Sequence, residues 1–101
     1  MITNNLLIKL KERNNKNAEE AKAALLGMKG KIDFLQDLRV EIDIRHGDAS
    51  YDILLITHFS SMEDMEAYLN HPIHVEVSKY IAGVLASSAS VCYESFDSQT
   101  V

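Results

Sequence analysis

The sequence predicts an α+β fold in which helices cover one face of a four-stranded antiparallel sheet. The hydrophobic pattern changes its period along the chain and gives the order β-α-β-β-α-α-β between residues 4 and 96. One expected strand, at 51–59, is apolar on both faces in its middle, from Ile53 to Ile56, so both faces must be buried. This order is typical of a ferredoxin-like sandwich.

The first half of the chain begins with a strand at 4–11, where apolar and polar side chains alternate. A helix is expected over 18–29, because its apolar residues recur at steps of three and four. Asn17 is its expected N-cap, with Glu20 at the spacing of a capping box. Gly30 is expected to end this helix, since glycine tolerates a left-handed conformation.

The middle of the chain reads as two strands joined by a turn. Residues 38–45 alternate strictly between apolar and charged side chains, which indicates a strand with one wet face at a sheet edge. Gly, Asp and Ser at 47–50 supply turn chemistry. The strand at 51–59 follows.

Two helices separated by a sharp break come next. The first is expected at 61–69, with Ser60 or Ser61 at its start and Glu63 at the capping-box distance from Ser60. Pro72 disfavours helical geometry at the residue before it and suits the first position of a new helix. That second helix is expected to reach about residue 85, followed by a last strand at 89–96 and a polar tail at 97–101.

One face of the expected sheet lies beyond the reach of the helices. The strand at 51–59 is apolar on that face too, as is part of the first strand. A second copy of the chain, packed sheet against sheet, would cover it and can be two-fold symmetric. We therefore expect a homodimer that forms through the sheet faces.

Length and charge limit the classes of function. A chain of 101 residues is expected to form a single domain, 1–101, with its core at 4–96. The net charge of -5 argues against a nucleic-acid partner, whose backbone would repel the protein. No apolar run approaches the length of a membrane span, so no membrane partner is expected.

The cysteine content and the N-terminal residues bear on location. The single cysteine, Cys92, cannot form an internal disulfide, which fits a reducing compartment. The apolar start at Leu6 is too short for a secretory signal and is followed by lysines. A cytoplasmic protein is the expectation. The sequence has no Gly-rich phosphate loop or other cofactor motif, so no cofactor is predicted.

The side chains best suited to chemistry gather near the helix break. Tyr68 and His74 can act as proton donor and proton acceptor near neutral pH, although both could instead be structural. His71 and His74 stand three residues apart, a spacing that a metal could use. His58 and Glu76 are the available recruits for further ligands, and no metal site is predicted. Asn4, His58 and His71 are candidate ligand contacts.

The break and the strands around it resemble the stress-responsive A/B barrel family, a branch of the dimeric α+β barrel superfamily. The resemblance covers about residues 4–94. Its most specific part is the string Y-x-x-H-P-x-H after F-x-S. The matching residues are Tyr51-Asp52, Phe59, Ser61, Tyr68, His71, Pro72 and His74, with Ile8-Lys9-Leu10-Lys11 and Val91-Cys92-Tyr93-Glu94 at the two ends.

The resemblance implies a homodimeric α+β barrel and a pocket between sheet and helices. Plant polyketide cyclases of this family use a tyrosine and a histidine, at the places of Tyr68 and His74, to assist an intramolecular aldol closure. A histidine of their first strand supports the tyrosine. Here Asn4 takes that place, or Asn5 if the register slips, and asparagine cannot titrate.

Three functions therefore stay open. The first is the binding of a small apolar molecule in the pocket. The second is an enzyme of the polyketide-cyclase or cofactor-free monooxygenase type, with His74 as base and Tyr68 as acid. The third is a structural or interaction role through oligomers larger than a dimer.

Overall fold

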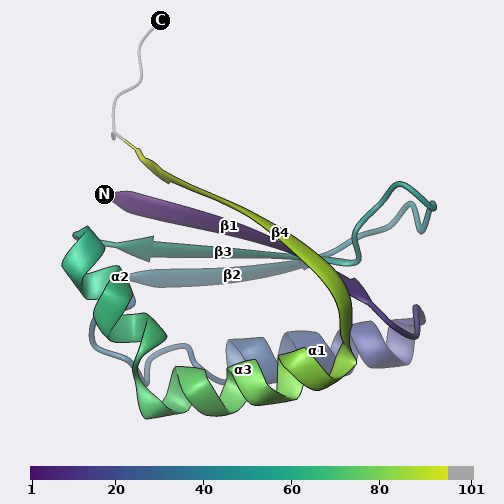
Figure 1. The fold of residues 1–101 in the computed structure, drawn as a ribbon, viewed down its shortest axis with the longest axis horizontal. Coiled ribbons are helices and arrows are strands. Elements are labelled where there is room, and N and C mark those ends of the chain that lie inside the picture. The colour runs from purple at the N-terminus through teal and green to yellow at the C-terminus, as the bar shows by residue number, and fades with distance from the viewer. Residues whose placement is uncertain (96–101) are drawn as a thin grey trace, which may run out of the picture.

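The structure is a computed structural model, and residues 1–95 are described. A four-stranded antiparallel sheet has its helices on one side, which confirms the expected α+β, ferredoxin-like fold (Figure 1). The strands are in the order β2-β3-β1-β4. The elements are β1 (Ile2–Leu10), α1 (Asn15–Leu26), β2 (Asp37–Ile42), β3 (Ile53–Phe59), α2 (Met62–Leu69), α3 (Pro72–Val84) and β4 (Leu85–Glu94).

Alternation of side chains gives the sheet an inner face toward the helices and an outer face. The middle strands β3 and β1 pair with Leu6 opposite Leu55 and Leu7 opposite Leu54. Leu55 is 5 % exposed on the inner face, whereas Leu7 is 37 % exposed on the outer face. The largest fully buried side chains of the core between sheet and helices are Ile8, Met28, Leu38, Ile53, Thr57 and Phe59.

Helix α1 is shifted toward the N-terminus relative to the expectation. Its N-cap is Asn14, whose side chain accepts a hydrogen bond from the Asn17 backbone N–H at 2.8 Å. The Asn17 side chain instead donates to the Glu12 carbonyl. The helix ends at Leu26, because glycine at position 27 propagates a helix poorly. Gly30, with φ of +79°, lies in the turn beyond rather than at the cap.

The break between α2 and α3 forms where proline predicts it. Ser61, not Ser60, caps α2 and accepts from the Asp64 backbone N–H at 3.1 Å. Helix α3 begins at Pro72, and its last residue is followed directly by β4. β4 therefore starts at residue 85, four residues before the expected strand, and Phe96 and the tail at 97–101 lie outside the described residues.

An ion pair ties the loop between β2 and β3 to the end of β1. Asp52 is 6 % exposed and accepts from the Leu10 backbone N–H at 2.8 Å and from Arg13 Nε at 3.0 Å. Arg13 Nη2 donates to the carbonyls of Gly47 and Ser50 in that loop. The loop is thereby fixed at the end of the sheet far from α2 (Figure 1).

Candidate functional site

A small chamber lies between the sheet and the helices. Its volume is about 180 Å³. Among the described residues, no Asp, Glu, Lys or Arg lines the chamber. Its polar side chains are those of Tyr68, His74 and Ser78. Its walls are otherwise apolar, from Leu6, Ile8, Leu25, Met28, Leu55, Val77, Ile81 and Leu85.

Tyr68 comes from the last turn of α2 and is only 3 % exposed. Its ring packs against Phe59, with 5.0 Å between the ring centroids. The hydroxyl group contacts the thioether sulfur of Met28 at 3.9 Å, and a thioether is a weak acceptor. Burial raises the pKa of Tyr68 to about 12, so the hydroxyl stays protonated at neutral pH and can donate to a stronger acceptor.

His74 comes from the first turn of α3, which follows the break at Pro72. Its Nδ1 lies 3.0 Å from the Leu69 carbonyl oxygen. Because a carbonyl oxygen can only accept, Nδ1 carries the proton and Nε2 is the basic nitrogen of the neutral ring. Nε2 lies 3.3 Å from the Ser78 hydroxyl.

The protonation of His74 follows from its surroundings. Burial lowers the pKa of His74, and the hydrogen bond to the Leu69 carbonyl opposes that shift in part. The ring is therefore neutral at neutral pH. The chamber thus combines a protonated phenol and an unprotonated imidazole, whose ring centroids are 4.4 Å apart.

The three candidate ligand contacts lie outside the lining of this chamber. The Nδ1 atom of His71 accepts from the Ile73 backbone N–H at 3.1 Å and caps α3. Asn4 lies on the inner face opposite Cys92, nearer to the start of β1. His58 points to the outer face, where its Nδ1 lies 2.9 Å from the Thr3 hydroxyl.

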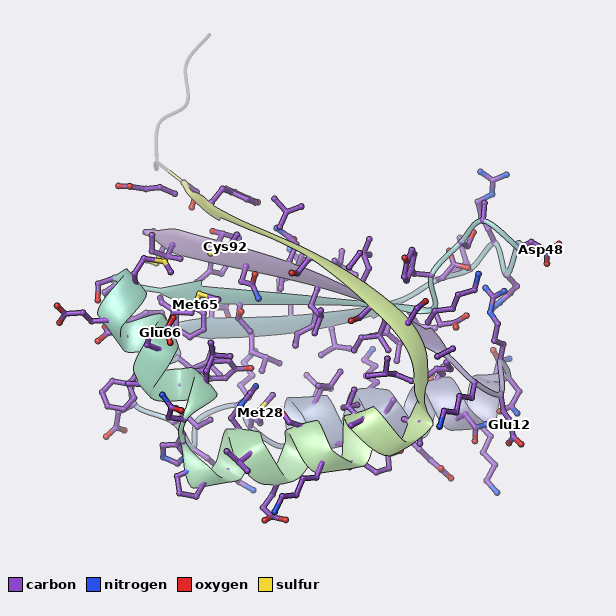
Figure 2. All side chains as sticks on the ribbon, in the orientation of Figure 1. Glu12, Met28, Asp48, Met65, Glu66 and Cys92 are labelled. Carbon is purple, nitrogen blue, oxygen red and sulfur yellow. The ribbon has the colours of Figure 1, made fainter. Side chains whose placement is uncertain are left out.

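Two further residues of the chamber, Ser78 and Met28, were not predicted from the sequence. Ser78 stands one helical turn after His74, and that spacing was the available signal. Met28 comes from the end of the α1 region, and nothing in the sequence connects it with Tyr68. Figure 2 shows Met28 in the layer between the sheet and α3.

Within residues 1–95, no three His, Cys, Asp or Glu side chains gather where they could hold a metal ion. None of the helices in the same range has the length and apolarity needed to cross a membrane.

Three larger hollows open on the surface of residues 1–95. One, of about 290 Å³, lies beside Lys11 and Tyr80. A second, of about 430 Å³, lies beside Glu41 and the β2–β3 loop. A third, of about 310 Å³, lies beside the Arg13–Asp52 ion pair. All three include carboxylate side chains in their walls, whereas the chamber is nearly all apolar and holds the Tyr68–His74 pair. The chamber is therefore the candidate site.

The fold and the chamber define a ferredoxin-like α+β protein with a pocket between its sheet and helices. The chain belongs to the family described as the stress responsive A/B barrel domain, whose family model matches residues 2–95. Among curated proteins, no sequence matches the chain.

Solved structures share the fold over nearly the whole chain. A dimeric protein of unknown function and ferredoxin-like fold from Bacteroides fragilis is 26% identical, with a TM-score of 0.78 over 92% of this chain and 94% of that chain. A dimeric ferredoxin-like protein of unknown function from Thermobifida fusca is 22% identical, with a TM-score of 0.80 over 91% and 88%. A hydroxynitrile lyase from Passiflora edulis is 11% identical, with a TM-score of 0.78 over 98% and 96%.

Proposed function

We propose that this protein binds a small, neutral, largely apolar molecule with one oxygen acceptor in the chamber beside Tyr68 and His74. The observation that carries the proposal is a buried hydroxyl whose partner is a thioether, set in an otherwise apolar wall. A ligand oxygen would give Tyr68 a better acceptor. An apolar cavity of about 150 Å³ is large enough for benzene, so a chamber of this size suits a ring-sized group.

Cyclohexanone is a suitable probe, because it is neutral, ring-sized and carries one carbonyl. We expect its titration to shift the amide NMR signals of the residues around Tyr68, His74 and Ser78. Cyclohexanecarboxylate should leave those signals unchanged, because its charge would lose its hydration in an apolar chamber.

A pair of variants on α3 provides the control. Val77 lines the chamber, whereas Val75 on the same helix is 37 % exposed and does not. Val77→Phe should fill the space and abolish binding, and Val75→Phe should bind as the wild type does. Binding that survives Val77→Phe, or equal binding of the carboxylate, would refute the proposal.

A second candidate function is an enzyme that removes a proton next to a carbonyl group. It is favoured by the fixed tautomer of His74, which leaves Nε2 basic, and by the neighbouring phenol of Tyr68. His74 would take the α-proton and Tyr68 would donate to the carbonyl oxygen as the enol forms. An aldol closure begins with this step, and a hydroxynitrile lyase shares the fold.

Exchange of the α-protons of cyclohexanone in D₂O tests the enzyme directly. The protein should accelerate the exchange over buffer, the rate should fall as His74 becomes protonated, and His74→Gln should abolish the acceleration. Binding of cyclohexanone without faster exchange would leave ligand binding standing and exclude this proton-transfer chemistry for that probe.

The outer face of the sheet supports the homodimer. Its side chains include Val91 at 64 % and Tyr93 at 46 % exposed, and Ala89 of the same strand lies opposite Leu7. A second copy packed on this face would remove its apolar surface from water. The patch consists of Leu7, Leu54, Ile56, Ala89, Val91 and Tyr93.

Sedimentation velocity at micromolar concentration tests the interface. The wild type should sediment as a dimer and Val91→Glu as a monomer, because the carboxylate would be buried without a partner. Ile44→Glu is the control, since Ile44 is 89 % exposed in the loop after β2. A monomeric wild type contradicts the dimer, and sedimentation as a larger assembly would favour the structural or interaction role.

A further inference from the structure

We propose that the inner face of β4 forms the second half of the ligand site and holds the hydrogen-bonding end of the ligand. We call this surface the polar shelf and define it as the side chains of Ser88, Ser90 and Cys92. The inference rests on ligand binding in the chamber and adds that the ligand is an amphiphile, with a ring-sized apolar body and a short tail that bears a hydroxyl or carbonyl group.

The register of β1 and β4 places the polar shelf beside the chamber. Ser88 lies opposite Ile8, and Ser90 lies opposite Leu6. Opposite residues of an antiparallel pair share one face, with Cβ atoms about 5 Å apart. Because Leu6 and Ile8 both line the chamber, the two serines lie next to the wall that β1 contributes to it.

The contact of Cys92 fixes which face of β4 turns toward the helices. Its sulfur lies 3.6 Å from the sulfur of Met65 in α2, and the two side chains are seen together in Figure 2. Since side chains alternate along a strand, Ser90 and Ser88 share this inner face.

The shelf is polar and open, unlike the rest of the inner face. All three of its residues are exposed, although they face the helical side of the sheet. Sheet faces that helices cover are normally apolar, as the inner residues Leu38, Val40, Ile53 and Leu55 are here. Small hydroxyl-bearing residues contribute little to a helix contact, but each can both donate and accept a hydrogen bond.

The size of the chamber explains why a ligand would need this surface. At about 180 Å³ it has room for one ring-sized group, so a longer molecule must extend out of it. On β4, Ser88 and Ser90 place their hydroxyl groups next to the β1 wall of the chamber. A ligand tail with a hydroxyl or carbonyl group could bond to them there, while its apolar body stays inside.

Two probes and two variants test the shelf. The probes are propylbenzene and 3-phenyl-1-propanol, which differ by one hydroxyl group. Ser90→Val removes the inner hydroxyl. Ser87→Val makes the same change on the outer face of the same strand, opposite Lys9. Valine suits a strand, so both variants should fold.

We expect Ser90→Val to raise the dissociation constant for 3-phenyl-1-propanol roughly fivefold, which is the effect of one lost neutral hydrogen bond. The dissociation constant of this variant for propylbenzene should stay within about twofold of the wild-type value, because propylbenzene has no group that could bond to the serine. Ser87→Val should change neither dissociation constant, because residue 87 lies on the outer face. Equal effects on both probes, or no effect of Ser90→Val, would overturn the shelf while leaving the chamber intact. If neither probe binds the wild type, the chamber and the shelf both fall.

Cys92 supplies a second readout, because it is the single cysteine of the chain and is exposed. Bound 3-phenyl-1-propanol should slow its alkylation by iodoacetamide more than bound propylbenzene does, because only the alcohol has a hydroxyl group that can hold the tail on the shelf by a hydrogen bond. Equal alkylation rates with and without the alcohol at saturation would count against a tail on the shelf. Ser90→Ala replaces Ser90→Val if the valine variant does not fold.

Discussion

The rings of Tyr68 and His74 meet at a tilt of 53°, with 4.4 Å between their centroids, although they belong to different helices. The break before Pro72 allows this contact between the two rings. Helix α2 ends at Leu69 and α3 begins three residues later, so the two side chains converge from opposite sides of a sharp corner. The first two predictions concern this pair.

Removal of the Tyr68 hydroxyl should separate ligand binding from stability. Its partner is the Met28 sulfur at 3.9 Å, so Tyr68→Phe should change the free energy of unfolding by less than about 1 kcal/mol. Cyclohexanone should bind roughly fivefold more weakly, because its carbonyl loses a donor. Urea unfolding and NMR titration measure the two effects. A large loss of stability would instead make the hydroxyl a structural group.

The lowered pKa of His74 should make stability depend on pH in a definite direction. The folded protein keeps the ring neutral below the usual histidine pKa of about 6.5, so the unfolded chain takes up its proton first. The stabilisation by the neutral ring is present above that pH and is lost as the pH falls through the lowered pKa. His74→Gln removes this component, so its urea midpoint should fall less than that of the wild type between pH 7.5 and 5. Parallel curves would contradict the shift.

Loss of Asp52 should destabilise the protein strongly. Its buried carboxylate bonds both the Leu10 backbone N–H and Arg13, so Asp52→Ala should lower the free energy of unfolding by about 2–4 kcal/mol. The exposed pair of Arg39 and Glu41 is the control, and Glu41→Ala should cost less than about 1 kcal/mol. Similar losses in the two variants would show that the buried pair has no special role.

The two serines before α2 should behave differently. Ser61→Ala removes the hydroxyl that accepts from the Asp64 backbone N–H and should cost about 1 kcal/mol. Ser60→Ala should be close to neutral, because Ser61 holds the cap. Thermal unfolding of both variants decides the matter, and the reverse order would restore the expectation of a capping box at Ser60 and Glu63.

The sequence was informative where periodicity carries the signal. Alternation predicted the strands and their faces, except that the strand expected at 38–45 ends at Ile42 and leaves Ile44 89 % exposed in the loop. Alternation also places His58, because Phe59 is a core residue and its neighbour must point to the other face. The break followed from proline geometry. The expected order of elements and the edge position of β2 are therefore confirmed.

Details that depend on the exact path of the backbone were less accessible. The run of asparagines at 14, 15 and 17 offers several caps, and the extended backbone at Asn14 selects the first. The assembly of the chamber depends on tertiary packing, which brings Met28 to Tyr68 across 40 positions of the chain. The roles of Tyr68 and His74 in binding or catalysis stay predictions that the experiments above can decide.

The direct passage from α3 to β4 constrains how this family member can change its length. Val84 ends the helix and Leu85 starts the strand, so no linking residue exists to absorb an insertion. One added residue there, without a bulge to absorb it, would turn β4 over and carry Val91 and Tyr93 inward. The ten-residue loop at 43–52 can accept insertions and deletions, whereas the α3–β4 junction permits substitutions but no insertion.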